Sequence, residues 1–251
     1  MDENGLLGVS TDLGYQLLRS GAETYRVEET VLRFVRAYRV HEVSVFAVPT
    51  CIMVSITGED GATVTQNRRV HARTVDLDRI DRLNSFCRGV CAGPPPVEEA
   101  RRALEEIGRA RPYPLPMRVL GFMLIAFSFT LFFGGTAADA LSALALGAAA
   151  QLVVWGMERW GANGVFINVI ASGLIAVLAM AAVRLGLAHN VDKMVIGTFM
   201  TLVPGVALTN AMRDIMAGDY LAGQARLTEA LLTAAALALG AGAALGVARL
   251  L

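Results

Sequence analysis

Long apolar segments after residue 118 limit what this chain can fold into. There are five, at residues 119–133, 140–157, 165–183, 194–212 and 230–248. Most reach the roughly 18–20 residues with which a helix crosses about 30 Å of hydrocarbon. The sequence is 55% hydrophobic with a mean hydropathy of +0.51, which is above the average of soluble proteins. We therefore expect an integral membrane protein whose residues 119–251 form an all-α domain of about five transmembrane helices.

Charged residues are concentrated ahead of these segments. Residues 1–111 hold 15 of the 22 Arg and Lys residues and 16 of the 22 Asp and Glu residues. The formal net charge is zero, and Lys193 is the single lysine, which argues against binding to nucleic acid. We expect residues 1–111 to form a separate, water-exposed domain.

This first domain has the patterns of an α+β fold. Helical spacing of apolar residues covers 6–20, 23–38, 76–91 and 97–109, with Asp76 as an expected N-cap. Runs of β-branched residues predict strands at 42–48, 51–57 and 62–66. The sequence Gly58-Glu59-Asp60-Gly61 predicts a tight turn between the last two strands.

A proline-rich stretch, residues 112–118, separates the two domains. It contains Pro112, Pro114 and Pro116, which favour a stiff, extended connector. The expected organisation is therefore a domain at 1–111, a connector at 112–118 and a membrane domain at 119–251.

The flanks of the apolar segments predict an orientation. If five helices alternate, most basic flanking residues fall on one side, namely Arg109, Arg111, Arg118, Arg159, Arg213 and Arg226. The first residues lack the basic and apolar runs of a signal peptide. We expect a multi-pass protein of the cell (inner) membrane, with its N-terminal domain in the cytoplasm and its C-terminus outside.

The fourth apolar segment is interrupted. Pro204 and Gly205 lie in its middle, where proline removes a backbone donor that lipid cannot replace. Secondary transporters build substrate sites at such breaks, because freed backbone groups become ligands. The alternative is a kinked packing helix followed by an ordinary loop.

Polar residues follow this break. Asn210, Arg213, Asp214 and Asp219 are candidates for a transport path, and Asn168 on the preceding segment could face it. A desolvated Asp214 or Asp219 could carry a proton, and Arg213 could pair with a substrate carboxylate. The alternatives are a structural pair of Arg213 with Asp214 or Asp219, and an Asn168 that only bonds a neighbouring helix.

Several separated motifs resemble one family. In order they are residues 20–28 (SGAETYRVE), 45–50 (VFAVPT), 202–205 (LVPG), then Asn210, Arg213-Asp214, Gly218-Asp219 and 229–231 (EAL). The chain resembles the threonine/serine exporter family, in particular the longer subunit of its split, two-component form, which includes a succinate exporter. The match spans nearly the whole chain.

The resemblance implies export of small polar metabolites, either threonine and serine or a dicarboxylate such as succinate, driven by the proton gradient. It implies a role for Asn210, Arg213, Asp214 and Asp219 near the transport path, and for Glu23 and Arg26 in the cytoplasmic domain. It also implies a small second hydrophobic membrane subunit, self-association, or both, besides the small-molecule substrate and membrane lipid. No catalytic residue and no cofactor is expected.

Two other functions remain open at this stage. A membrane-tethered hydrolase would need His41, His71 or Ser85, but no catalytic motif surrounds them. A ligand-sensing regulatory protein would use the basic stretch 67–73, with Arg68, Arg69 and Arg73 as its binding face, although pairing with local acids is the simpler interpretation. Cys87 and Cys91 lie one helical turn apart without further ligands, so no metal site is expected.

Overall fold

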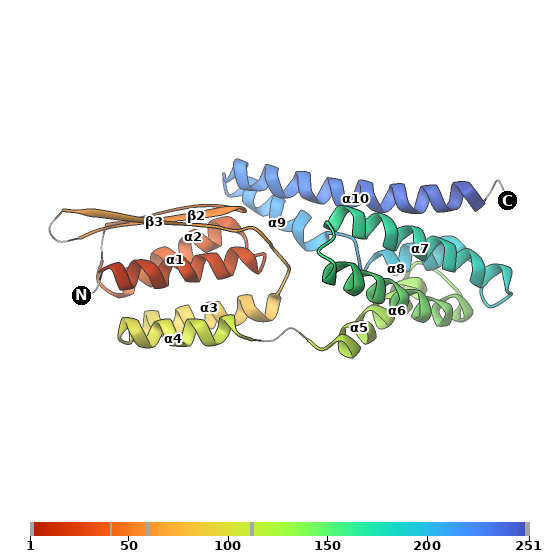
Figure 1. Cartoon of the computed structure of the whole chain (residues 1–251), viewed down its shortest axis with the longest axis horizontal. Coiled ribbons are helices and arrows are strands. Elements are labelled where there is room, and N and C mark those ends of the chain that lie inside the picture. Colours follow the sequence, from red (N-terminus) through yellow and green to blue (C-terminus); the bar gives the residue numbers. More distant parts are fainter. Residues whose placement is uncertain (1–2, 41, 59–60, 111–112, 249–251) are drawn as a thin grey trace. The chain divides into compact units, whose positions relative to one another are not determined.

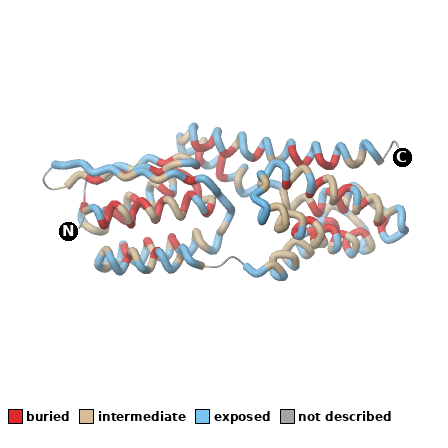
Figure 2. The backbone as a smooth tube through the Cα atoms, viewed as in Figure 1, coloured by how far each residue is buried: buried red, intermediate tan, exposed pale blue. Residues whose placement is uncertain are grey.

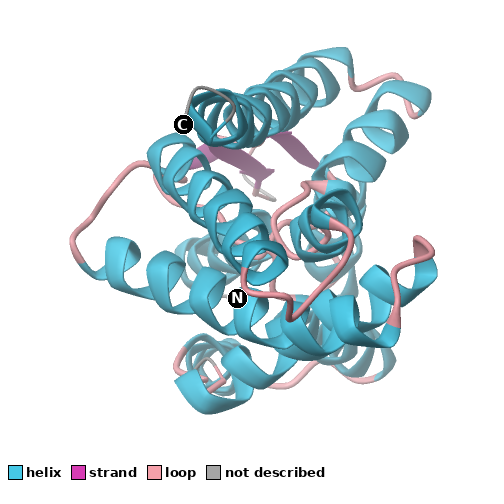
Figure 3. Cartoon of the chain, turned by 90° about the vertical axis from the view of Figure 1, so that its right-hand side faces the viewer, coloured by secondary structure: helices cyan, strands magenta, loops and turns pink. Residues whose placement is uncertain are grey.

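The computed structural model describes residues 3–40, 42–58, 61–110 and 113–248 (Figure 1). Helices predominate over a single small sheet (Figure 3). The chain divides into two compact units. Unit 1 consists of Met1–Arg111 with Gly205–Thr228, and unit 2 consists of Pro112–Pro204 with Glu229–Leu251. A segment far along the chain therefore belongs with the N-terminal residues.

The sheet of unit 1 is antiparallel, in the order β1 (Val43–Val48), β2 (Cys51–Thr57) and β3 (Thr63–Arg69). Val48 pairs with Cys51, so Pro49 and Thr50 form a two-residue connection. The three predicted strands are confirmed, but β3 runs to Arg69 because it pairs with β2 as far as Cys51. Of the predicted turn, Glu59 and Asp60 lie outside the described residues.

Four helices cover the sheet in two layers. They are α1 (Glu3–Arg19), α2 (Thr24–Ala37), α3 (Leu77–Ala92) and α4 (Val97–Gly108), close to the predicted ranges. α1 and α2 pack on the sheet, and α3 and α4 pack on α1 and α2 (Figure 1). The predicted N-cap is confirmed, since Asp76 accepts a hydrogen bond from the Arg79 amide at 3.0 Å.

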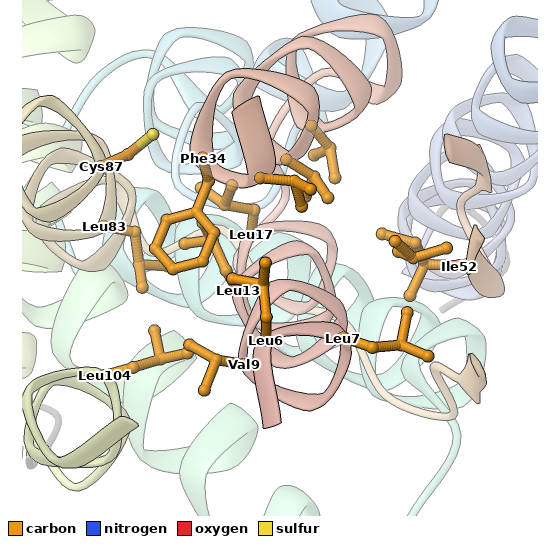
Figure 4. Close-up of a cluster of buried hydrophobic side chains, with 14 of the residues drawn as sticks. Leu6, Leu7, Val9, Leu13, Leu17, Phe34, Ile52, Leu83, Cys87 and Leu104 are labelled. Atoms are coloured by element: carbon orange, nitrogen blue, oxygen red, sulfur yellow. The ribbon is translucent and has the colours of Figure 1, made fainter. Parts of the chain in front are cut away.

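α1 is the centre of this core and is buried along most of its length (Figure 2). Its side chains point to both sides, with Leu7 toward Ile52 of β2, and Leu13 toward the side on which Phe34 and Leu83 lie (Figure 4). Burying apolar surface on both faces of one helix fixes α1 between sheet and helices.

Unit 2 is helical throughout its described part. It contains α5 (Leu115–Phe132), α6 (Ala137–Arg159), α7 (Gly164–Arg184), α8 (Val191–Phe199) and most of α10 (Tyr220–Ala248). α5 begins at Leu115, so residues 115–118 are helical and not part of an extended connector. Proline fits the first turn of a helix, where its missing amide would have no partner.

Four described helices are long and apolar enough to cross a membrane: α5, α6, α7 and α10. The predicted fourth crossing is split into α8, which ends at Phe199, and α9 (Gly205–Met216). At nine and twelve residues, each is shorter than a typical crossing. The break predicted at Pro204 and Gly205 is confirmed, whereas five continuous crossings are not.

α10 begins at Tyr220, ten residues before the apolar segment that predicted it. The sequence from Tyr220 to Glu229 is rich in good helix formers and contains no proline, so its polar residues continue the helix instead of forming a loop. Arg226 therefore lies on a helix.

Small residues let the helices of unit 2 pack closely. A Cβ atom on Gly147 of α6 would lie 2.6 Å from the Phe122 carbonyl oxygen of α5, and one on Gly240 of α10 would lie 2.1 Å from the Val169 carbonyl oxygen of α7. Only glycine fits at such contacts, so these backbones touch directly.

Candidate functional site

The site in unit 1 is organised around the turn between α1 and α2, residues 20–24, called here the α1–α2 turn. Gly21 has φ +87°, which favours glycine, and a Cβ atom there would lie 2.9 Å from the Thr74 carbonyl oxygen. The turn leaves the carbonyls of Gly21 and Ala22, and the amide of Thr24, to be paired by other elements.

Asp214 of α9 pairs with the start of α2. Its carboxylate accepts hydrogen bonds from the Thr24 amide at 2.9 Å and from the Thr24 hydroxyl at 3.3 Å. Glu23 occupies the N-cap position, but its own side chain makes no capping bond. A carboxylate at a helix N-terminus satisfies unpaired amides and interacts favourably with the helix dipole. Asp214, which is fully buried, therefore acts as an N-cap supplied from a distant part of the chain.

Arg226 of α10 completes the pairing of the turn. Its Nε lies 3.1 Å from Oδ2 of Asp214, and its guanidinium donates to the carbonyls of Gly21 and Ala22. Asn210 of α9 also donates to the Gly21 carbonyl, at 3.0 Å. Because Arg226 is almost fully buried, its charge needs both the carboxylate and the carbonyl oxygens. α9 and the start of α10 thus bond both the amide donor and the carbonyl acceptors of the α1–α2 turn.

A second ion pair lies at the rim of this cluster. The Arg213 guanidinium contacts the Glu23 carboxylate at 2.6 Å, and Arg26 approaches the other carboxylate oxygen at 3.9 Å. The Arg213 side chain is 55% exposed, whereas that of Glu23 is only 11% exposed. Arg213 and Arg26, whose side chain is 61% exposed, are therefore the cations of the cluster that a solute carboxylate can reach.

Three carboxylates of unit 1 have a raised pKa, and two of them interact with Arg226. Burial raises the pKa of Asp214, against the effect of Arg226 and of the two Thr24 bonds. Burial also raises the pKa of Asp219, with Arg226 opposing it. For Glu28, burial raises the pKa first, and the charges of Asp219 and Asp214 raise it further, although the Ala47 amide bond lowers it. Arg226, the buried cation of this cluster, interacts with both Asp214 and Asp219, which favours a bound proton on one of these acids.

The structure brings most predicted site residues together. Asn210, Arg213, Asp214 and Asp219 lie in unit 1 with Glu23 and Arg26. The Asp219 amide donates to the Asp214 carbonyl at 2.8 Å, at the turn into α10. The expected alternative pairing is wrong, because Arg213 pairs with Glu23 and Asp214 pairs with Arg226.

Three predicted residues are not part of this cluster. Asn168 is half-buried on α7 in unit 2. Pro204 and Gly205 lie at the break, the former half-buried and the latter exposed at the start of α9. Their role in a transport path remains a prediction.

Three residues of the cluster are not predicted from the sequence. Thr24, Glu28 and Arg226 were not chosen as site residues, although Arg226 belongs to the polar series after the break. The signal that could have found them is unpaired backbone groups. A turn with free carbonyl groups needs a cationic donor, and a helix N-terminus without a capping side chain needs an acidic acceptor. Only the fold shows that residues 190 positions apart, such as Thr24 and Asp214, are hydrogen-bonded to each other.

The other candidate groups have local partners. Arg68 pairs with Asp12 and stacks on the Tyr15 ring at 4.1 Å, and Arg73 donates to the Pro49 carbonyl at 3.1 Å. Arg68 thus pairs with a local acid, as the simpler interpretation predicts, whereas Arg73 bonds a backbone carbonyl.

No metal-binding group of three His, Cys, Asp or Glu residues occurs among the described residues. Cys87 and Cys91 have sulfur atoms 4.0 Å apart, and burial raises the pKa of the Cys87 thiol to about 12.

Of the hydrolase candidates, His71 follows β3 and Ser85 lies on α3, both exposed, and His41 is outside the described residues.

Comparisons with known proteins agree with the motif resemblance. Residues 9–248 match a family model described as "Putative threonine/serine exporter". The "Probable threonine/serine exporter" of Mycobacterium tuberculosis is 26% identical over 94% of this chain and 45% of its own length. The "Threonine/serine exporter" of Corynebacterium glutamicum is 22% identical over 95% of this chain and 50% of its own length. The chain thus spans about half the length of these curated relatives. No solved structure matches it.

Proposed function

Because the chain belongs to the threonine/serine exporter family, we propose that it forms part of a membrane exporter for small polar metabolites. The observation that carries this proposal is the family match over residues 9–248, which includes both units and the four helices suited to crossing a membrane. Membership of a transporter family also favours transport over catalysis, so the chain is proposed to be a transporter component and not an enzyme.

Threonine and serine are the first candidate cargos, because both curated relatives carry these names. A dicarboxylate such as succinate is the second. All three carry a carboxylate, and Arg213 offers a half-exposed guanidinium that can bind a carboxylate with two hydrogen bonds. In this proposal the cargo carboxylate displaces Glu23 from Arg213, so that binding of cargo loosens the contact between α9 and the start of α2.

We further propose that export is coupled to protons at the carboxylates around Arg226. Asp219 is the best proton carrier among them, since burial raises its pKa while its side chain remains half-accessible. Asp214 is fully buried and already bonded to Thr24 and Arg226, which suits it to a fixed structural charge. A shifted carboxylate near a membrane can load and release a proton across a gradient.

The proposed assembly is that of the split form. A small second hydrophobic membrane subunit, or another copy of this chain, would supply further helices beside the exposed apolar side chains of α5, α7 and α10, the remainder of which would face lipid. We propose that the protein lies in the cell (inner) membrane, with residues 1–111 in the cytoplasm and the C-terminus outside, as the basic flanks indicate.

The test is efflux from proteoliposomes. Purified chain, with and without the candidate second subunit, is reconstituted and loaded with labelled threonine, serine or succinate, and release is followed with and without a pH gradient. We expect release of at least one cargo above empty liposomes, faster with the gradient. Arg213→Ala should raise the cargo KM, and Arg109→Ala, on an exposed helix end, is the matched control. Release of none of the three cargos in either assembly would contradict the proposal.

A further inference from the structure

The membrane helices of unit 2 contain a buried amide whose polar atoms have no partner. Gln151 of α6 is fully buried, and neither its Oε1 nor its Nε2 is hydrogen-bonded to any described residue. In the described part of unit 2, the one other such side-chain atom is the hydroxyl of Thr198 on α8, a helix packed against α6. The remaining buried polar side chains of this unit are bonded, as Asp139 is to Asn190 and Ser172 is to the Val169 carbonyl.

Gln151 lies near the middle of its helix. It is eight residues before the end of α6 at Arg159, and Ser172 is eight residues after the start of α7 at Gly164. At 1.5 Å per residue, both lie about 12 Å from the short connection between these two helices, so they share one depth. Gly240 of α10 packs against Ser172 at this level. Substrate sites of secondary transporters lie near this depth.

The residues next to Gln151 on α6 are small and closely packed. Gly147, one turn earlier on the same face, packs against the Phe122 carbonyl and the Ala126 side chain of α5, and Ala150 beside it is fully buried. These neighbours are small and apolar. A buried amide without hydrogen bonds lowers the stability of the fold, whereas a leucine of similar size at this position would not. A residue that lowers stability at the depth of a substrate site has a functional explanation.

We propose that Gln151 binds the side-chain hydroxyl of the cargo. A carboxamide offers one acceptor and two donors, and a hydroxyl is the small neutral group that both donates and accepts. A second carboxylate, by contrast, would use only the donors of Gln151 and leave its carbonyl oxygen unpaired. The inference rests on the proposed export function and narrows its cargo to hydroxylated amino acids. Full burial fits an occluded site that opens when the helices separate during transport.

Selectivity follows from this chemistry. A site built to bond a hydroxyl discriminates against an analogue that lacks it, because its own polar groups then stay unpaired. The chain should prefer threonine over 2-aminobutyrate, and serine over alanine, by about tenfold, the effect of one hydrogen bond of ordinary strength. Gln151→Leu should abolish the preference.

The test measures binding and stability, not transport. Full-length wild type, Gln151→Leu and the control Ser172→Ala are purified in nanodiscs, and binding of threonine and 2-aminobutyrate is measured by calorimetry beside thermal unfolding without ligand. Ser172 is buried at the same depth, but its hydroxyl is bonded within its own helix. We expect Gln151→Leu to lose the preference for threonine and to unfold about 2–4 °C higher than wild type, while Ser172→Ala keeps the preference.

Either of two results would overturn the inference: wild type that binds threonine no better than 2-aminobutyrate, or a Gln151→Leu variant that unfolds at a lower temperature with its preference intact. If either result were found in a protein that still exports succinate, the proposed export function would remain supported, and only the role of Gln151 would be refuted.

Discussion

Asp214 of unit 1 and Gln151 of unit 2 are both buried polar side chains, but they differ in their hydrogen bonding. In unit 1, Asp214 is fully buried, and its carboxylate is bonded to the Thr24 amide, the Thr24 hydroxyl and Arg226. In unit 2, Gln151 is equally buried but has no partner among the described residues. The first arrangement fixes a structure, because the buried carboxylate is both hydrogen-bonded and ion-paired. The second leaves the carboxamide donors and acceptor of Gln151 available to a ligand.

The surfaces of the two units also differ. Unit 1 buries one stripe of α2 and α4 and exposes charged residues on the other side, as expected for a domain in water. α5 of unit 2 exposes large apolar side chains such as Leu120, Leu124 and Phe132. A surface of this kind requires lipid or further helices.

The largest effect should come from removing the buried cation of unit 1. Arg226→Met leaves Asp214 buried without its ion-pair partner and the carbonyls of the α1–α2 turn without a donor, so we expect a loss of about 3–5 kcal/mol of unfolding free energy. Denaturant unfolding of the full chain measures it. Arg213→Met, at a pair whose cation is mostly exposed, should cost at most about 1 kcal/mol. Equal losses in the two variants would contradict the distinction between the buried Arg226–Asp214 pair and the Arg213–Glu23 pair, whose cation is exposed.

Helix packing in unit 2 gives the next largest effect. Gly240→Ala places a Cβ atom against the Ser172 hydroxyl and the Val169 carbonyl, which should cost about 1–3 kcal/mol. Gly242→Ala, two residues further on with no atom within 4 Å of its Cβ position, should instead gain about 0.5–1 kcal/mol from helix propensity. Thermal unfolding distinguishes them, and a stabilised Gly240→Ala would argue against the close contact of α7 and α10.

The α1–α2 turn offers a smaller, paired comparison. Gly21 and Gly61 both have positive φ, but only Gly21 is crowded, by the Thr74 carbonyl oxygen. Gly61→Ala should cost about 1 kcal/mol for the left-handed conformation alone, and Gly21→Ala about 2 kcal/mol. Chemical unfolding of both variants checks the order, and the reverse order would exclude crowding at the turn.

The raised pKa of Asp219 should be visible in how the unfolding free energy depends on pH. Because the pKa of Asp219 is raised in the folded state, its protonated form contributes stability that is complete below the unfolded value of about 4 and is lost as pH rises through the folded value. Asp219→Asn should flatten this decline and be more stable than wild type at pH 7. Unfolding curves from pH 4 to 8 test both, and an unchanged slope in Asp219→Asn would refute the assignment.

The smallest effect concerns thiol reactivity. Cys91 is exposed, whereas Cys87 is buried and its pKa is raised to about 12, so it forms little thiolate at neutral pH. A maleimide should label Cys91 first, and Cys91→Ser should remove that fast phase. Fast labelling that persists in Cys91→Ser, and disappears only with Cys87, would place α3 differently.

Most elements of the fold could be predicted from the sequence, because hydrophobic spacing reports local structure. The strands, α1 to α4 and the break before Gly205 follow from such patterns, and Asp76 follows from capping chemistry. Pairing across the chain could not be predicted. No local pattern indicates that Asp214 caps α2 or that Arg226 binds the carbonyls of residues 21 and 22. The start of α10 at Tyr220 was missed for a related reason, since polar residues that find partners in the fold resemble a loop in the sequence.

The most direct test of proton-coupled export separates coupling from transport. Proteoliposomes with wild type or Asp219→Asn are assayed for exchange of labelled for unlabelled threonine at equal pH, and for net efflux driven by a pH gradient. Exchange needs no net proton movement, so we predict that Asp219→Asn retains exchange and loses the acceleration of net efflux by the gradient. Gradient-driven efflux in Asp219→Asn equal to that of wild type would contradict the account.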